Sequence, residues 1–498
     1  MSNRRRAGLL AAACSAGLMA GAFSVAPLSI ARAESLADAV ALAYQTNPTL
    51  QQQRAVQRAT DESVVRARTG FRPTVNASAS LTNSRTDLAN PSTTVVGGVL
   101  VTGSDVNKVG ASNATIQLSQ PLYTGGQATA NLSAAEADVM AGREDLRRVE
   151  QSVLANVVTA YVDVRRNQET LRIANENVAV LTRQLDESNA RFEVGEITRT
   201  DVAQSQARLA AAKASQSSAQ GNLAIARATY AQIVGQNPTD LTPEPSLAGV
   251  LPASVEQAFD AAEGSNPAVL AARYAEQAAT ARVALAKSAY LPTVSAGASL
   301  GYDASEVNGN GKQFGQYDRA IAGSVTARVP LFTGGLNASN VRTARERENA
   351  ARIAVDGAKR TVIQQVSAAW STLLAARANL VSNEEQVRAT RIAFEGVRQE
   401  QQVGLRTTLD VLNAQLELAN AELALVGARR DEYVASAVLL QAMGQLDVTK
   451  LAAGATTYDP KASYDRVTHS AGWVPWEPVV QAIDKVGAPS TKPRPASK

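Results

Sequence analysis

Residues 120–127 read QPLYTGGQ, and residues 329–336 read VPLFTGGL, so one short phrase occurs twice, 209 residues apart. The echo extends well beyond the phrase. At the same shift, VGEITRTDV (194–202) matches VGLRTTLDV (403–411) without a gap. A repeat of this length indicates that the chain was built from two copies of one structural unit.

A second echo lies upstream, at a shift of 219 residues. SLADAVALAYQTNP (35–48) matches SVEQAFDAAEGSNP (254–267), and FRPTVNASAS (71–80) matches YLPTVSAGAS (290–299). Each unit therefore has roughly 200 residues, and repeats have to be identified before domains are counted. We place a first repeat at 34–238, a linker near the middle of the helical part at 239–253, a second repeat at 254–446 and a C-terminal tail at 447–498.

The N-terminus has the features of an export signal. Arg4, Arg5 and Arg6 precede an apolar run, and a small-residue site ends before Glu34. Residues 1–33 are therefore predicted to be a signal peptide.

The leader also affects the charge and the cysteine chemistry of the chain. It holds four of the 49 basic residues and none of the 45 acidic ones, so the mature chain is neutral. Charges of both signs are dispersed, which excludes a basic nucleic-acid surface. Cys14, the only cysteine, lies in the leader. The mature chain is thus predicted to lack disulfides, with lipid modification at Cys14 as the alternative.

The segment 127–194 has the pattern of a very long helix. It contains no proline, and apolar residues recur at every seventh position. These are Val157, Val164, Leu171, Val178, Leu185 and Phe192. The pattern recurs in the second repeat, and a period of 3.5 residues is typical of helices that pack along one seam. At about 1.5 Å per residue, such a helix is roughly 100 Å long.

Each long helix is followed by a shorter return arm. A glycine, Gly195 or Gly404, is followed by threonine and aspartate, which is the usual chemistry for ending one helix and starting another. We therefore predict long helical hairpins at 127–235 and 336–444. Leading helices, at about 36–70 and 255–289, have the length to stack end to end with the return arms.

Between the helices lie the only strand-like segments. They alternate apolar and polar residues over about nine positions, which is typical of a strand with one apolar and one polar face. They are TVNASASL (74–81), NATIQLSQ (113–120), TVSAGASLGY (293–302) and IAGSVTARV (321–329). We predict β-hairpins at 74–120 and 293–329, with the segment 82–108 as a loop.

Four strands cannot close on themselves, and lipid does not tolerate an open sheet edge. After residue 33 no apolar run is long enough for a membrane helix, so we expect several chains to share a barrel. Three chains give twelve strands, enough for a water-filled lumen. The fold class is therefore mainly α with a membrane β-barrel.

The opening phrase is predicted to form the turn from strand to helix. Proline ends the strand, an aromatic residue lies at the membrane interface, and two glycines allow the bend. The residues are Pro121, Tyr123, Gly125 and Gly126 in the first copy, and Pro330, Phe332, Gly334 and Gly335 in the second. In the first copy Thr124 and Gln127 also fit a capping box.

The leader, the twofold repeat, the strand pairs and the VGxxTxxDV tips together resemble the TolC family of outer-membrane factors, from about residue 35 to 447. The resemblance implies a homotrimer with a twelve-stranded β-barrel in outer-membrane lipid, continued by a twelve-helix α-barrel in the periplasm. It also implies efflux or type I secretion of drugs or proteins. The implied partners are a periplasmic adaptor (membrane fusion) protein and an inner-membrane ABC, RND or MFS transporter.

The resemblance also implies roles for residues at the hairpin tips. Asp410 matches an acid that rings the entrance, while Asn413 stands where a second acid is expected. Arg406 matches an arginine that links to the neighbouring tip, where Thr200 and Asp201 form the acceptor side. The alternative role for both aspartates is helix capping.

Other tip residues are implied to serve docking and closure. Gln401 stands where a tyrosine often assists closure of the entrance. An adaptor is expected to dock on the tip residues Val194, Gly195, Val403 and Gly404.

Two other classes of protein compete with the channel. An enzyme is poorly supported, because the only histidine, His469, lies in the tail and no carboxylate pair or metal motif is evident; no cofactor or metal is expected. A periplasmic coiled-coil adaptor or scaffold without a pore is the alternative, but it leaves the strands and the duplication unexplained. The tail is predicted to be largely disordered because it is rich in Pro, Ala, Ser and Lys.

Overall fold

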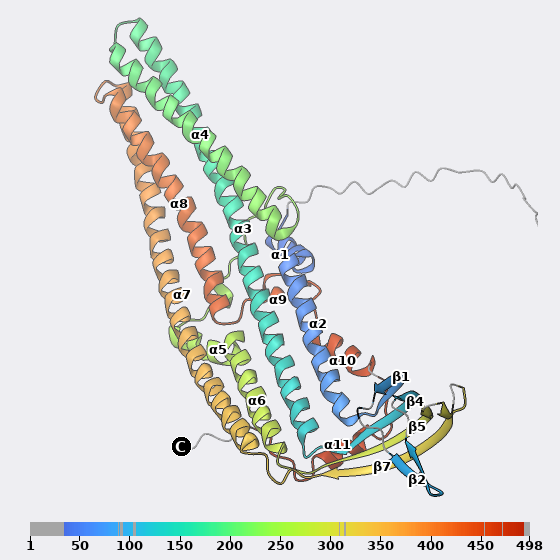
Figure 1. Ribbon diagram of the computed structural model, residues 1–498. Helices are drawn as coiled ribbons and strands as arrows, with labels where there is room; N and C mark the ends of the chain where they lie inside the picture. Colours follow the sequence, from blue (N-terminus) through green and yellow to red (C-terminus); the bar gives the residue numbers. More distant parts are fainter. Residues whose placement is uncertain are drawn as a thin grey trace, which may run out of the picture.

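The computed structural model describes residues 34–492, apart from residues 88, 90–92, 103–105, 308, 313–314, 453 and 471. The predicted signal peptide, with Cys14, lies outside the described residues. Figure 1 shows an elongated molecule in which long helices run from a pair of hairpin tips to a β-sheet at the opposite end. We call the turns at residues 194–198 and 403–407 the tips.

The predicted helical hairpins are confirmed in both repeats. The long helices α3 (Gln127–Glu193) and α7 (Leu336–Gln402) have 67 residues each. The return arms α4 (Arg199–Val234) and α8 (Thr408–Ala442) run beside their tip halves. Within the described residues, no helix has the length and apolar character needed to cross a membrane.

The seven-residue seam of α3 is buried where several elements meet it. Val157 and Val164 are fully buried, whereas Phe192, close to the tip, is 44% exposed. The difference arises because the middle of α3 is covered by α1 and α4, while its tip end packs mainly on α4. The seam pattern therefore predicts the helix, and its neighbours decide how much of it is buried.

Each leading helix is divided in two, which corrects the prediction of a continuous helix. The first repeat has α1 (Leu36–Thr46) and α2 (Pro48–Arg68), extended by a short 3₁₀ turn η1 (Thr69–Phe71). The second has α5 (Val255–Ser265) and α6 (Pro267–Ser288). The break lies at an Asn-Pro pair, because a residue before proline disfavours helical backbone. Asn47 accordingly has ψ of 123°.

The side chain of Asn47 joins two helices that are far apart in sequence. Its oxygen accepts a hydrogen bond from the backbone N–H of Thr49 (3.0 Å) and so caps α2. Its Nδ2 donates to the carbonyl of Ile233 in the last turn of α4 (2.9 Å). The return arm α4 thus continues end to end into α2, as the helix lengths suggested.

The second repeat builds the same joint from its own residues. Asn266 Nδ2 donates to the carbonyl of Ala442 (2.7 Å), and Ser265 Oγ donates to the carbonyl of Met443 (2.8 Å). The helices approach so closely that a Cβ on Gly444 would lie 2.6 Å from the Cα of Asn266. We refer to these two connections, at Asn47 and Asn266, as the asparagine joints.

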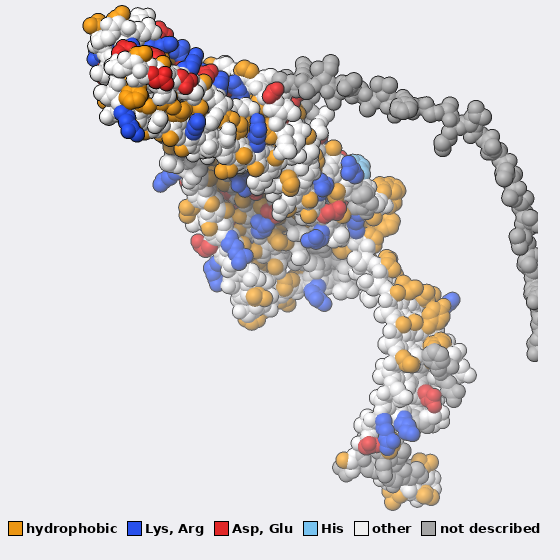
Figure 2. Space-filling model, turned by 90° about the horizontal axis from the view of Figure 1, so that it is seen from above, with side chains coloured by type: hydrophobic (Ala, Val, Ile, Leu, Met, Phe, Trp, Pro, Cys, Tyr) orange, Lys and Arg blue, Asp and Glu red, His pale blue; other side chains and the backbone are white. Residues whose placement is uncertain are grey.

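The strands form an antiparallel sheet that is larger than predicted. Its long strands are β1 (Thr74–Asp87), β4 (Val106–Tyr123), β5 (Thr293–Val307) and β7 (Asp318–Arg328), in the order β1-β4-β5-β7, with the short β6 (Asn310–Gly311) also on β5. The segment predicted as a loop extends β1 and β4 and carries a further hairpin, β2 (Thr93–Val96) and β3 (Val99–Thr102). Figure 2 shows the sheet as a narrow arm leaving the helical body.

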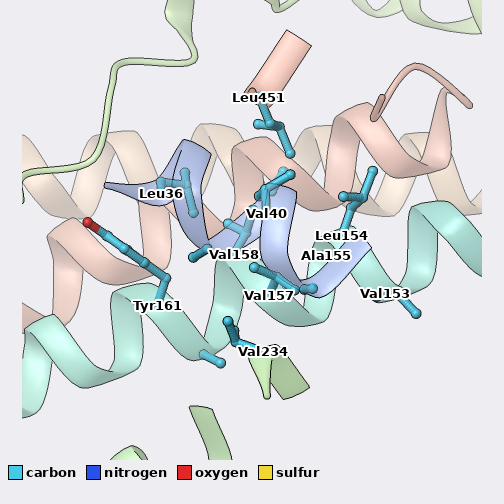
Figure 3. Close-up of a cluster of buried hydrophobic side chains, with 14 of the residues drawn as sticks. Leu36, Val40, Val153, Leu154, Ala155, Val157, Val158, Tyr161, Val234 and Leu451 are labelled. Atoms are coloured by element: carbon cyan, nitrogen blue, oxygen red, sulfur yellow. The ribbon is translucent and has the colours of Figure 1, made fainter. Parts of the chain in front are cut away.

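The largest hydrophobic cluster lies at the middle of α3. Figure 3 shows Leu36 and Val40 of α1 facing Val157 and Val158 of α3, with Leu451 of the tail beside them. The linker also reaches this cluster, since η2 (Ala248–Val250) follows directly after the buried Leu247. The two repeats are therefore fastened together at mid-length.

The C-terminal tail is ordered in its described part, which corrects the prediction of disorder. It forms α9 (Val448–Leu451), α10 (Pro460–Ser470) and α11 (Glu477–Asp484). Helix α10 packs on α2, and α11 packs on β4, η1 and the start of α3. The composition of the tail did not predict these helices because they are short and depend on partners elsewhere in the chain.

Asp484 provides the tightest of these long-range contacts. Its side chain is fully buried, and its two oxygens accept hydrogen bonds from the backbone N–H groups of Thr124 (2.7 Å) and Thr129 (3.2 Å) and from both hydroxyls (2.7 and 2.8 Å). A carboxylate at the first turn of a helix is stabilised by the unpaired N–H groups there. Asp484 therefore caps α3, and the capping box predicted for Thr124 and Gln127 does not form.

The asparagine joint generates a first prediction. Asn47→Ala removes both the cap of α2 and the hydrogen bond to Ile233, so we expect stability to fall by about 1–3 kcal/mol. Thermal unfolding followed by helical circular dichroism measures the change. Asn222→Ala, at an exposed position of α4, is the control and should leave the melting temperature unchanged. Equal melting temperatures for the two variants would contradict the role of the joint.

A second prediction concerns Asp484. Burial acts to raise its pKa, but the hydrogen bonds from Thr124 and Thr129 outweigh burial and lower the pKa below its ordinary value. The carboxylate therefore stabilises the tail above its ordinary pKa of about 4, and this contribution is lost as pH falls through the lowered value. Asp484→Asn should remove about 1.5–3 kcal/mol at neutral pH.

Limited proteolysis of the tail at pH 7 checks this expectation. We expect the Asp484→Asn chain to be cut near α11 faster than the wild type, while the exposed substitution Asp465→Asn on α10 changes nothing. Identical cleavage of all three proteins would show that Asp484 does not hold the tail in place.

Candidate functional site

Both tips are built by the same local chemistry. Gly195 and Gly404 have positive φ values of 75° and 79°, which end the long helices in the left-handed conformation that glycine adopts most easily. Three residues later, Thr198 and Thr407 cap the return arms. The repeated VGxxTxxDV sequence is therefore explained by the residues that a tight helix–turn–helix connection needs.

The two tip aspartates complete capping boxes. Asp410 Oδ2 accepts from the N–H (3.0 Å) and the hydroxyl (2.8 Å) of Thr407, and Asp410 N–H donates back to the Thr407 hydroxyl oxygen (3.2 Å). Asp201 makes the same set of bonds with Thr198. Capping, which the sequence left open for both residues, is thus present at both tips.

Capping leaves Asp410 accessible and charged. The pKa of its carboxyl is lowered, first by the backbone N–H of Thr407, then by the Thr407 hydroxyl and the positive charge of Arg406. One carboxylate oxygen accepts no bond from Thr407. Asp410 can therefore cap its helix and present a negative charge to solvent at the same time.

Arg406 has a partner within its own hairpin. Its Nε lies 2.8 Å from an oxygen of Glu400, the last acid of α7 before the tip. Thr200 and Asp201, the acceptors implied for this arginine, belong to the other tip of the same chain, where Asp201 is engaged with Thr198. The hydrogen bonds recorded for the described residues do not bring Arg406 and this pair together within the chain.

Asn413 connects the two hairpins. Its Oδ1 accepts a hydrogen bond from Arg208 Nη2 of α4 (3.0 Å). Sequence reasoning missed Arg208, which stands at a polar position without a motif around it. A contact of this kind keeps the two tips of one chain side by side, as Figure 1 shows.

A small hydrophobic cluster lies directly beneath this contact. Leu412 of α8 is 2% exposed and packs with Leu181 of α3 and Leu209 of α4. The cluster joins helices from both repeats near the tips. We refer to Leu412, Leu181, Leu209 and Ala212 as the tip cluster.

Gln401 is buried although it stands close to the exposed tip. It is 3% exposed, and its Nε2 has no hydrogen-bond partner among the described residues. A buried amide without a partner is unfavourable. Gln401 therefore faces the interior of its own hairpin, where its amide nitrogen makes no hydrogen bond with the described residues.

The outermost tip residues are apolar and exposed. Val194 and Val403, which flank the tip glycines, are 78% and 71% exposed, and Leu405 is 76% exposed. Isolated exposed apolar residues are common, but these three project from the end of the molecule in both hairpins. They form the surface on which docking of a partner is predicted.

The two strand-to-helix turns have the same glycines but different surroundings. All four glycines, Gly125, Gly126, Gly334 and Gly335, have positive φ. The first turn is enclosed: a Cβ on Gly125 would lie 2.7 Å from Leu291. At the second turn no described residue lies within 4 Å of a Cβ added at Gly334 or Gly335, and Leu331 and Phe332 are 94% and 90% exposed.

No group of three or more His, Cys, Asp or Glu residues in the described part of the chain could hold a metal ion. A cavity of about 800 Å³ lies beside the second asparagine joint, lined by α7, α8 and residues such as Gln364, Gln365 and Arg430. Its lining is mostly alanine and amide side chains, without an arrangement of nucleophile and base.

Comparison with known proteins gives a consistent picture. A family model described as outer membrane efflux protein matches residues 39–236 and 258–445, one match for each repeat. The outer membrane efflux protein BepC of Brucella suis is 38% identical over 438 residues, covering 88% of this chain and 91% of BepC. The outer membrane protein TolC of Vibrio cholerae is 28% identical, covering 85% and 94%.

A solved structure agrees in fold. The outer-membrane channel OprN superposes with a TM-score of 0.68 at 23% identity, covering 82% of this chain and 90% of OprN. At this identity the likeness concerns the fold, and it confirms the predicted combination of long helical hairpins with a β-domain.

The tip cluster generates a third prediction. Leu412→Ala leaves a cavity between the two hairpins, and truncation of a buried leucine removes about 2–5 kcal/mol. We expect faster hydrogen exchange in both tips, at residues 194–209 and 403–412. Leu416→Ala, one turn further along α8 and 39% exposed, is the matched control. Faster exchange in one hairpin only would mean that the cluster does not couple the two.

Proposed function

Because the chain belongs to the outer membrane efflux protein family and is an export channel of the outer membrane, we propose that three copies assemble into one pore. Its strands would form a twelve-stranded barrel in the lipid. Its helices would form a tunnel that continues the barrel into the periplasm. The relatives are channels, so the alternative of a scaffold without a pore is not supported.

The open edges of the sheet are the observation that carries the proposal. In the order β1-β4-β5-β7, the outer strands β1 and β7 each have one long edge without a partner strand in the described sheet. Unpaired backbone groups are not tolerated in a bilayer, and a barrel removes every edge. Pairing β7 of one copy with β1 of the next closes the sheet, and three copies supply twelve long strands.

Helix α7 supports the same arrangement. A row of large apolar side chains on α7 is exposed in the single chain, each by half or more. They are Ile353, Ile363, Leu374, Val381 and Ile392. An apolar stripe along a helix calls for a further helix to cover it, and a neighbouring copy supplies one. Leu331 and Phe332, exposed at the end of the same hairpin, would be covered at the same seam.

Around a threefold axis the tips would form the periplasmic entrance. Three Asp410 carboxylates would face one another across the opening, with Asn413 beside them. A ring of carboxylates favours cations over anions. Arg406, paired with Glu400 in the single chain, would exchange that partner for the neighbouring Thr200 and Asp201 when the entrance closes.

The exposed tip residues are the surface that we propose for partner binding. Val194, Val403 and Leu405 offer apolar contacts to the helical hairpin of an adaptor protein, which would connect the tunnel to an inner-membrane transporter. We propose no catalytic role, cofactor or nucleic-acid partner for the chain. Tyr123 and Phe332 would mark the level of the membrane interface.

Two measurements test the trimeric pore. The mature protein should be extracted from outer membranes only by detergent and should have the mass of three chains in multi-angle light scattering. Added to planar bilayers, it should give stable conductance steps. A detergent-solubilised monomer, or bilayers that stay silent at all voltages, would refute the proposal.

The entrance generates a fourth prediction. A unit charge a few ångströms from a permeating ion in water changes its energy by about 0.5–1 kcal/mol, so its local concentration changes roughly two- to fivefold. Asp410→Asn should therefore weaken the cation preference, and Asn413→Asp should strengthen it. Reversal potentials in a salt gradient measure both. Exposed Asp186→Asn on α3 serves as the control.

The capping box adds a pH dependence with a definite sign. Because the pKa of Asp410 is lowered, wild-type cation preference should persist below the ordinary aspartate range and disappear as pH falls further. Thr407→Val removes the hydroxyl bond, so the preference should disappear at a higher pH than in the wild type. Superimposable pH profiles would place Asp410 away from the ion path.

A further inference from the structure

Helix α11 lies against the apolar side of the sheet. Trp476, just before α11, donates its Nε1–H to Gln120 Oε1 of β4 (2.9 Å). In a strand, alternate residues share a face, so Gln120 lies on the face that carries Ile116 and Leu118. The other face carries Thr115, Gln117 and Ser119, the polar residues expected toward a lumen.

The position of α11 along the molecule is equally defined. Figure 1 shows α11 where the helical body ends and the sheet begins. Arg72, just before β1, pairs with Glu477 at the start of α11 (2.8 Å), and Tyr123 at the end of β4 donates its hydroxyl to the carbonyl of Val486 (3.0 Å). In a barrel with its strands in lipid, this is the level of the periplasmic membrane surface.

One face of α11 is fixed to the protein and the other is free. Val480 and Asp484 are buried against the first strand-to-helix turn. Val479 and Ile483, four residues apart on an adjacent face of α11, are 59% and 45% exposed, and Val486, just after the helix, is 69% exposed. The helix therefore packs through Val480 and Asp484 and leaves Val479 and Ile483 uncovered.

The residues around this face are typical of a membrane interface. Trp473 is 83% exposed, and tryptophan is enriched in membrane-interface belts, where one end of the ring is in an apolar and the other in a wet environment. Glu477 is paired and Asp484 is buried, so Lys485 is the charged side chain that α11 and its C-cap leave accessible. An exposed tryptophan, an apolar helix face and an accessible lysine are the features of helices that lie in the headgroup region.

We propose that α11 is an interfacial helix whose Val479, Ile483 and Val486, together with Trp473, insert into lipid of the periplasmic leaflet of the outer membrane. The proposal rests on the outer-membrane pore described above. It assigns a role to the C-terminal tail: Asp484 fixes α11 to the first strand-to-helix turn, and the exposed face anchors that turn in the membrane.

Lipid is favoured over a second copy of the chain as the occupant of this face. The sheet edges available to a neighbouring copy are β1 and β7, whereas α11 packs on β4, an inner strand of the sheet. The apolar face of α11 also continues the apolar side of the sheet, which lipid must cover in a barrel.

Spin labelling tests the proposal on the whole protein. Cys14, the only cysteine of the sequence, is replaced by serine, and Ile483→Cys is labelled with a nitroxide. The matched control is Val403→Cys, a similarly apolar and exposed residue at the tip. Both proteins are reconstituted in vesicles of phosphatidylethanolamine and phosphatidylglycerol. Power saturation then compares access of oxygen, which enriches in lipid, with access of a water-soluble nickel chelate.

We expect the label at residue 483 to be reached several-fold better by oxygen than by nickel, and the label at 403 to show the reverse. Equal behaviour of the two labels, or protection of residue 483 from both reagents by protein, would overturn the proposal. Val479→Cys repeats the measurement at a second position of the face.

Measuring the conductance of the same preparations distinguishes failure of the lipid-contact proposal from failure of the pore proposal. Channels with a water-exposed label at 483 would refute the lipid contact alone. A lipid-embedded label in vesicles without conductance would instead refute the pore.

Discussion

The buried seam of α3 is the interaction on which the rest of the structure depends. Both return arms and both membrane-side leading helices, α2 and α6, contact this one helix. Many other buried residues of α3 are small, among them Ala128, Ala130 and Ala134, which allow close approach but bury little area each. Stability must therefore come from length and from many neighbours, which explains a 67-residue helix in a chain without a globular core.

The duplication gives each repeat the same parts, but the parts are not supported equally. At mid-length the two asparagine joints are nearly identical, down to a hydroxyl residue preceding each asparagine. At the strand-to-helix turns the repeats differ, because the tail encloses the first turn and leaves the second bare. The exposed stripe on α7 belongs to the same bare side. One repeat is completed by its own chain, and in the proposed pore the other would be completed by a neighbouring copy.

Sequence patterns were sufficient for the features that rest on local chemistry. The seven-residue period located α3 and α7, and the glycine-threonine-aspartate order located the tips. The break at Asn47 was missed, although Pro48 gave a local signal for it. The extension of β1 and β4 lacked regular alternation in the sequence. Arg208, the tip cluster and the tail helices are held by contacts across hundreds of residues, and one sequence carries no trace of such contacts.

The tail also changes the symmetry that duplication would otherwise produce. Two similar repeats in each of three copies would surround the tunnel axis with six nearly equivalent hairpins. Because α11 is attached to the first repeat only, every second hairpin in that ring would carry α11 and the others would not. In the proposed pore, a ring that is close to sixfold in its helices would therefore be strictly threefold where it meets the bilayer, and its three membrane contacts would stand like a tripod.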